Sequence, residues 1–139
     1  MQMPQPREVK YFADTARKAM RPDLVGTLAE KLAQETRQVA ASQMRRFYGD
    51  VLSLDRRLVP GADLPAEAIQ AHMALLKAKA AYAFRRAGGR RDQFPEELLQ
   101  FFVDHAAAVK DQQDFAAFRR VFEAVIAYHK FHETKGGRD

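Results

Sequence analysis

A window of the sequence without acidic residues carries a cluster of basic side chains suited to binding phosphate. The window spans residues 68–91, and its basic residues are Lys77, Lys79, Arg85, Arg86, Arg90 and Arg91. On a helix, Lys79 and Arg86 lie seven residues apart on nearly the same line, and Lys77 and Arg85 form a second line. Each cation that neutralises a phosphate releases counterions, which adds affinity that does not depend on base sequence. The window therefore predicts an uncompensated basic ridge that fits a nucleic-acid backbone.

Tyr82 adds an aromatic ring between the two basic lines. Aromatic rings in basic grooves stack on nucleic-acid bases, so Tyr82 is a candidate for contact with a base or a ribose. The alternative is a solvated helix face whose charges only keep the protein in solution, with Tyr82 packed in the core. Both interpretations fit the composition of the window.

A second group of arginines lies within residues 42–58. Asp50 is four residues from Arg46 and seven from Arg57, so we expect its carboxylate to neutralise both arginines in part. Arg45 lies on another flank of the same predicted helix.

Other candidate chemistry is weak. His129 and His132 are three residues apart, a spacing that can hold a metal on one helix, but only Glu133 lies near them as a further ligand. We interpret them as histidines at a solvent edge, and we expect no metal and no cofactor. Ser42 is interpreted as a helix N-cap, and no pair of carboxylates lies on an apolar face, so we expect no enzymatic activity.

Helices must position these side chains, and the clearest of them covers residues 115–131. Its charged residues share one sector of the helical wheel, about 100° wide, and these are Arg119, Arg120, Glu123 and Lys130. The rest of the circumference is apolar except for His129, whereas surface helices bury a narrower stripe. The sequence therefore predicts an all-α fold, a single compact bundle of about five to six helices in which the C-terminal helix, residues 113–135, is central.

Apolar residues at helical spacing predict the remaining elements. The expected helices cover residues 8–20, 22–35, 42–58, 65–87 and 95–110. A loop rich in proline and glycine precedes the fourth of them, and Gly88 ends it because glycine adopts the left-handed conformation cheaply. We expect one helical domain, 1–139, with residues 1–7 and 136–139 mobile.

Composition narrows the functional classes. The chain of 139 residues contains no cysteine, which excludes disulfides, thiolate metal sites and cysteine catalysis. Its first residues lack an apolar run, so we expect no signal peptide, and the longest apolar run is too short to cross a bilayer. We therefore expect a cytoplasmic protein without a membrane partner. The net charge of +5 favours a polyanionic partner only where the charge is clustered.

Three stretches in sequence resemble a known family. They are VAASQMRRFY at 39–48, LKAKAAYA at 76–83 and FEAVIAYHKF at 122–131. Their order and spacing are similar to those of the small subunit of type III-A CRISPR effector complexes, the Csm complexes. The resemblance covers roughly residues 36–137. One departure is Ala78, which stands between Lys77 and Lys79 where the family pattern has proline.

The resemblance implies a non-catalytic, RNA-binding subunit that serves in antiviral defense. Several copies stack inside such complexes beside the backbone subunits, and they contact the duplex of guide RNA (crRNA) and target RNA through a basic surface. Target RNA cleavage belongs to the backbone subunit, and the DNA and signalling activities belong to the large subunit. The partners implied are therefore both RNAs, the other Csm subunits and further copies of the chain itself.

Seven residues are the candidate RNA contacts. The motifs carry over Arg45, Lys77, Lys79 and Lys130, while charge and helix spacing add Arg85, Arg86 and Arg119. Each is expected to contact phosphate and to read no base sequence. Glu123 is expected to orient Arg119 or to pair with Lys130.

Two alternatives remain open from the residues alone. The first is a helical DNA-binding regulator, with residues 42–58 as its recognition helix. The second is a helical scaffold that binds only protein, in which acidic residues of the segments 92–97 and 111–114 meet a basic face on the next copy.

Overall fold

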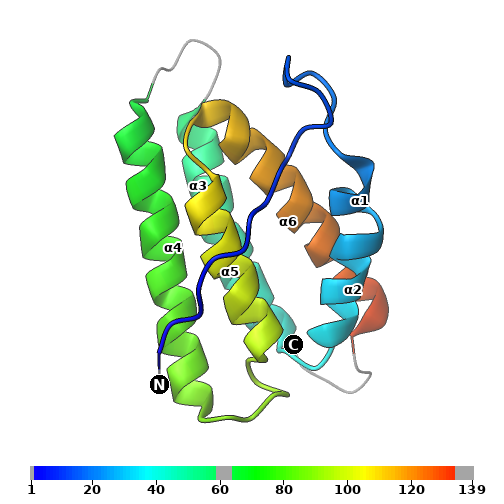
Figure 1. Cartoon of the computed structure of the whole chain (residues 1–139). Helices are drawn as coiled ribbons and strands as arrows, with labels where there is room; N and C mark the ends of the chain where they lie inside the picture. The colour runs from blue at the N-terminus through cyan, green and yellow to red at the C-terminus, as the bar shows by residue number, and fades with distance from the viewer. Residues whose placement is uncertain (1, 59–63, 134–139) are drawn as a thin grey trace.

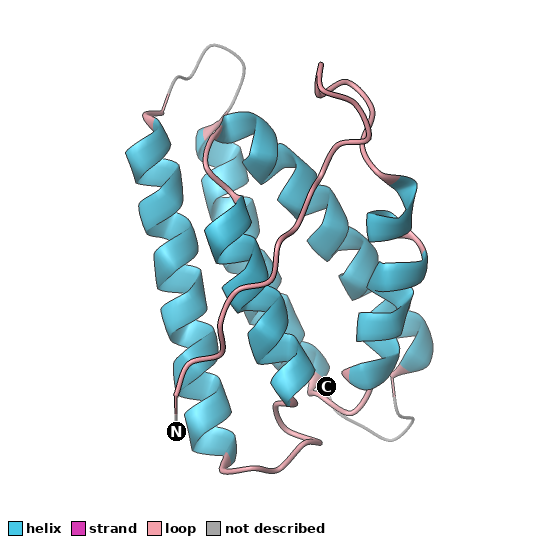
Figure 2. Ribbon diagram, viewed as in Figure 1, coloured by secondary structure: helices cyan, strands magenta, loops and turns pink. Residues whose placement is uncertain are grey.

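The computed structural model describes residues 2–58 and 64–133, and the elements in these ranges are helices (Figures 1 and 2). They are α1 (Pro22–Val25), α2 (Thr27–Glu35), α3 (Ala41–Arg57), α4 (Ala66–Ala87), α5 (Glu96–Ala108) and α6 (Gln112–His132). α1 and α2 form one helical region that is interrupted at Gly26, where a continuous helix over 22–35 was expected. The prediction of an all-α bundle of five to six helices is confirmed.

The C-terminal helix α6 crosses the middle of the bundle, as its wide apolar arc predicted (Figure 1). It packs mainly against α2 and α3, and it also contacts α1 and α4. Phe118, Phe122 and Val125 on α6 have no exposed surface, while Arg120 and Lys130 in the predicted polar sector are exposed. A helix covered on most of its sides buries a far wider arc than a surface helix does.

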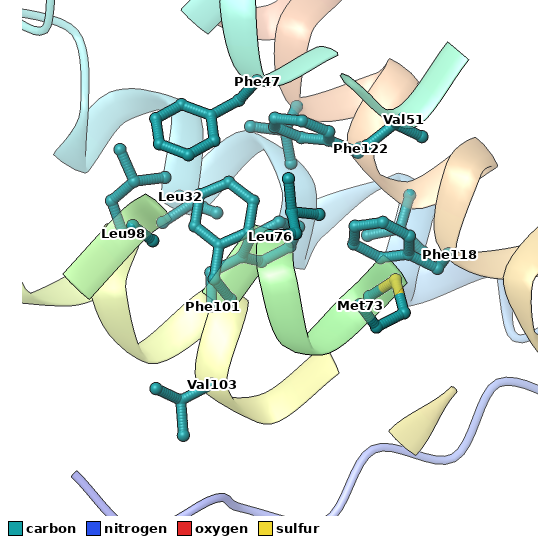
Figure 3. Close-up of a cluster of buried hydrophobic side chains, with 14 of the residues drawn as sticks. Leu32, Phe47, Val51, Met73, Leu76, Leu98, Phe101, Val103, Phe118 and Phe122 are labelled. Carbon is teal, nitrogen blue, oxygen red and sulfur yellow. The ribbon is translucent and has the colours of Figure 1, made fainter. Parts of the chain in front are cut away.

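Aromatic rings join α6 to α3 and α5 at the centre of the core (Figure 3). The Phe122 ring centroid lies 5.6 Å from the centroids of both Phe101 and Phe102 on α5. Phe47 of α3 stacks on Phe102 at 4.8 Å. Such pairs contribute about 0.5–1.5 kcal/mol each beyond the area that they bury. Packing between these aromatic rings therefore helps to hold α3, α5 and α6 in position.

α4 forms one edge of the bundle, beside α5 and α3 (Figure 1). It begins after Pro65, whose backbone is extended, and it ends at Gly88, whose φ of 58° is left-handed. These are the boundaries that the turn residues predicted. Its buried stripe includes Ile69, Met73 and Leu76, which leaves the opposite side of the helix exposed.

The prediction of a helix over residues 8–20 is wrong. This segment runs without helix across the face of α5 and folds back on itself, with an antiparallel bridge between Phe12 and Met20 (Figure 2). The Asp14 carboxylate accepts hydrogen bonds from the backbone N–H groups of Lys18 and Ala19, at 3.0 Å each. Aspartate side chains favour turns over helices in this way. The local apolar spacing was too sparse to outweigh this turn.

Ion pairs fasten the N-terminal segment to the ends of α5 and α6. Arg7 bonds the buried Asp104 carboxylate at 2.9 Å, and Arg17 bonds Asp111 at 3.0 Å and Asp114 at 2.6 Å. The Arg17 guanidinium holds the pKa of Asp111 below its usual range. The mobility of residues 1–7 stays a prediction, and residues 136–139 lie outside the described residues.

Several helix ends differ from expectation by one or two residues. α3 begins one residue earlier, after Ala40, and no side chain caps it, so the interpretation of Ser42 as an N-cap is wrong. α5 ends at Ala108, because Val109 has an extended backbone. α6 begins at Gln112, where the Asp111 side chain accepts a hydrogen bond from the N–H of Asp114. The expected extension of the last helix to residue 135 falls partly outside the described residues.

A tyrosine–histidine pair is buried where the N-terminal segment crosses α5. The Tyr11 hydroxyl lies 2.7 Å from Nδ1 of His105, and both side chains are buried. Burial lowers the pKa of His105 to about 4, although the neighbouring Asp104 opposes the shift. Burial also raises the pKa of Tyr11. Near neutral pH the imidazole is therefore neutral, and it shares one buried hydrogen bond with the Tyr11 hydroxyl.

This pair predicts acid destabilisation. The pKa of His105 is lower in the folded state than its ordinary value of 6.5, so the unfolded chain binds the proton more readily. The stabilisation that comes from keeping His105 neutral is complete above pH 6.5. It is lost as the pH falls towards 4, which lowers the free energy of unfolding by about 3 kcal/mol at most. Burial likewise lowers the pKa of His72 and His129, which adds to the loss.

Urea unfolding followed by circular dichroism between pH 7 and 4 measures this effect. His105→Leu should show a shallower fall in the free energy of unfolding over this range than the parent chain shows. Equal slopes in the two proteins would contradict the assignment to His105.

Candidate nucleic-acid interface

A basic groove lies between α3 and α4. It has a volume of about 640 Å³. Its polar and aromatic lining residues are Gln43, Arg46, Phe47, Asp50, Lys79, Tyr82, Arg86, Arg90 and Gln93. The groove contains four cationic side chains and one carboxylate among the residues that line it. We call these residues the α3–α4 groove.

Lys79 and Asp50 connect the two walls of the α3–α4 groove. The Lys79 Nζ lies 3.1 Å from the Asp50 carboxylate, so this lysine is not part of an uncompensated ridge as the sequence predicted. The acid-free window could not reveal this pair, because Asp50 lies on a different helix. Asp50 was expected to pair with Arg46 and Arg57, but its carboxylate bonds Lys79 instead. Arg46 and Arg86 form no ion pair within the described residues.

Tyr82 stands on the rim of the groove with 65% of its surface exposed, so the alternative of a core tyrosine is wrong. The Arg86 guanidinium carbon lies 5.7 Å from the centroid of the Tyr82 ring, within the range of a cation–π contact. An exposed ring beside a guanidinium offers both a stacking surface and a phosphate contact.

Lys77 and Arg85 do not line the α3–α4 groove. Residues two apart on a helix point about 160° apart, so Lys77 lies on the opposite flank of α4 from Lys79. Lys77 is partly buried and Arg85 is exposed on the outer side of the helix. The two basic lines of the sequence analysis therefore do not form one surface, and only the line of Lys79 and Arg86 faces α3.

The other three candidates lie on α3 and α6. Arg119 is held between Asp55 of α3, at 3.3 Å, and Glu123, at 3.1 Å, so the expectation that Glu123 orients Arg119 is confirmed. Lys130 bonds Glu133 at 3.1 Å. Arg45 is exposed on α3.

Sequence reasoning missed two groove residues. Arg46 had been assigned to a pair with Asp50, and Arg90 was counted in the basic window but was not singled out. Arg90 follows α4 and its guanidinium donates to the backbone oxygen of Arg86 at 3.2 Å. The sequence placed Arg86 on the same line of the helix as Lys79, but nothing in it showed that α3 supplies the facing wall.

The histidines are mostly structural. His129 is buried, and its Nε2 lies 3.1 Å from the backbone oxygen of Val39, so the interpretation of His129 as a solvent-edge residue is wrong. His132 pairs with Glu30 of α2 at 3.0 Å. In the described part of the chain, no group of three or more metal-ligating side chains is close enough to hold an ion. No described helix has the length and apolar character that a membrane span needs.

A family model for Csm2 of type III-A matches residues 19–135, which is most of the chain. The chain belongs to the Csm2 family. It is accordingly a small subunit of a type III-A CRISPR effector complex, the Csm complex, and it assembles with other subunits. Csm2 subunits are generally structural, non-catalytic components of that complex. Comparison with curated proteins and with solved structures gives no significant match. The expected family is confirmed.

Proposed function

We propose that this Csm2 subunit binds the backbone of the guide RNA–target RNA duplex through the α3–α4 groove. The observation that carries the proposal is the convergence of Arg46, Lys79, Arg86 and Arg90 on one groove that has an exposed tyrosine at its rim. Cations grouped in this way attract phosphates at any base sequence.

The residues of the α3–α4 groove have different roles in RNA binding. Arg46 and Arg86 are its main phosphate contacts, because neither guanidinium is engaged by a carboxylate of the described residues. Lys79 is held by Asp50 and sets the spacing of the two walls. Tyr82 stacks on a ribose or an unpaired base at the rim.

The remaining candidates form a second line of contact on α3, α4 and α6. These side chains contact phosphates of the same duplex or of the RNA held by a neighbouring copy. They are Arg45, Lys77, Arg85, Arg119 and Lys130. Arg119 presents its guanidinium with two carboxylates beside it, so its affinity for phosphate is weaker than that of Arg86.

Three of the five acidic residues in the segments 92–97 and 111–114 are engaged within the chain, which counts against a scaffold that binds only protein. Asp111 and Asp114 are bonded to Arg17, and Glu97 is bonded to Arg91 at 2.9 Å within the same chain. Carboxylates that already form ion pairs within their own chain are poor partners for a basic face on another copy.

Binding of the purified chain to duplex RNA, single-stranded RNA and duplex DNA across a salt series tests the function. We expect sequence-independent RNA binding whose logarithm falls with log salt at a slope of about −3, since each phosphate contact contributes about 0.9. A marked preference for one duplex DNA site would instead support a regulator, and affinity that does not change with salt would overturn the groove as the binding surface.

A further inference from the structure

Two glutamine side chains line the α3–α4 groove without a partner in the chain. Gln43 lies in the first turn of α3, and Gln93 lies in the turn that leads from α4 to α5. Neither side-chain amide forms a hydrogen bond within the described residues. By contrast, Gln70, Gln100 and Gln113 each donate to a backbone oxygen at least 40 residues away. The two amides of the groove are therefore open to a ligand.

The core fixes the backbone that carries both glutamines. Gln93 directly precedes the buried Phe94, whose ring centroid lies 6.0 Å from that of Phe47 on α3 and 6.4 Å from that of Phe84 on α4. Gln43 lies one helical turn before the same Phe47. A ligand that bonds these amides has to order only their side chains, because the backbone is already in place. This lowers the entropic cost of binding.

The glutamines lie at the end of the groove that also carries a guanidinium. α3 and α4 run in opposite directions, so the start of α3 lies beside the end of α4 (Figure 1). The Asp50–Lys79 pair joins the two helices. Gln43 is seven residues before Asp50, and Arg86 is seven residues after Lys79, which places these two side chains at a similar level of the groove. Gln93 follows in the turn just beyond α4.

We infer that Gln43 and Gln93 bond ribose 2′-hydroxyls and thereby make the groove prefer RNA to DNA, an inference that rests on the proposed RNA-binding function. Phosphate contacts alone do not tell the two nucleic acids apart, whereas the 2′-hydroxyl does. A carboxamide both donates and accepts, so it can meet a hydroxyl in either direction, while arginine and lysine only donate.

The shape of an RNA duplex suits this arrangement. In the A-form, 2′-hydroxyls line the wide and shallow minor groove, which is bordered by the phosphates. A phosphate that is held by Arg86 therefore brings a nearby ribose within reach of an amide at the same end of the protein groove. The cations supply most of the affinity, and the amides supply the choice of sugar.

A double variant, Gln43→Met with Gln93→Met, tests the inference because it removes both amides and keeps unbranched side chains. Fluorescence anisotropy should show about tenfold weaker binding of duplex RNA and a change of less than about twofold for duplex DNA of the same sequence. The salt slope should stay the same, because an amide releases no counterions. Gln34→Met with Gln38→Met, at exposed positions outside the groove, is the matched control and should change neither affinity.

A duplex RNA that carries 2′-fluorine in place of the hydroxyls separates recognition of the sugar from recognition of shape, since it keeps the A-form but cannot donate the hydrogen bond. The parent chain should bind it about tenfold more weakly than RNA, and the double variant should bind both alike. Equal binding of the two duplexes by the parent, or an unchanged preference for RNA over DNA in the double variant, would overturn this inference and leave RNA binding by the groove intact. A parent chain that binds no RNA would overturn the proposed function and this inference with it.

Discussion

Replacing Arg46 and Arg86 together by glutamine is expected to weaken duplex RNA binding about 100-fold at low salt. A hydrogen bond to a charged group contributes about 1.5 kcal/mol or more, which is about tenfold for each arginine. Both side chains line the α3–α4 groove and are exposed, so the fold should tolerate the change. The loss should be similar for every RNA sequence, and the salt slope should decrease by about two. Fluorescence anisotropy with labelled duplexes at several salt concentrations measures both quantities.

A matched control separates the groove from the total charge. Lys18→Gln with Lys31→Gln removes two positive charges from exposed positions outside the α3–α4 groove. It should change the affinity only slightly, and equal losses in the two double variants would contradict the groove. Asp50→Asn should act in the opposite direction, because it removes the carboxylate that engages Lys79 and should tighten binding.

Phe122→Ala should cost about 4 kcal/mol of folding free energy, the largest effect of any single substitution that we predict. The ring has no exposed surface, and its centroid lies within 5.8 Å of those of Phe101, Phe102 and Tyr48. Its removal leaves a cavity where α3, α5 and α6 meet, and these helices position the walls of the groove. Urea unfolding followed by circular dichroism measures the loss.

Phe131→Ala is the natural control because it makes the same change on the same helix. Phe131 is 80% exposed, so its replacement should alter the free energy of unfolding by less than about 0.5 kcal/mol. A comparable loss in both variants would show that the helix α6 depends on propensity and not on the buried cluster.

The helices that pack by periodic apolar faces were predictable from the sequence. α4 had both of its ends marked, by Pro65 and by Gly88, and its observed bounds agree with the prediction. α6 was expected to be central because its polar residues occupy one narrow sector, and that expectation also holds. Periodicity and turn residues act locally, so they can be interpreted without knowing the rest of the chain.

The N-terminal segment was not predictable in the same way. Its conformation depends on partners about 90 or more residues away, such as His105 for Tyr11 and Asp104 for Arg7. No local pattern encodes such contacts, and the weak apolar spacing of residues 8–20 suggested a helix that does not form.

The candidate site was predictable in its residue types and in part of its membership. By itself, the sequence determined that α4 carries an acid-free basic window with a tyrosine, and its three motifs determined the family. Only the tertiary structure decided which of these cations share a surface, because α3 packs against the flank of α4 that carries Lys79 and not against the flank that carries Lys77. Charge is a property of the residue, but whether a charge is compensated depends on which helix folds beside it. Asp50 on α3 compensates Lys79 on α4, and the sequence of α4 could not show this.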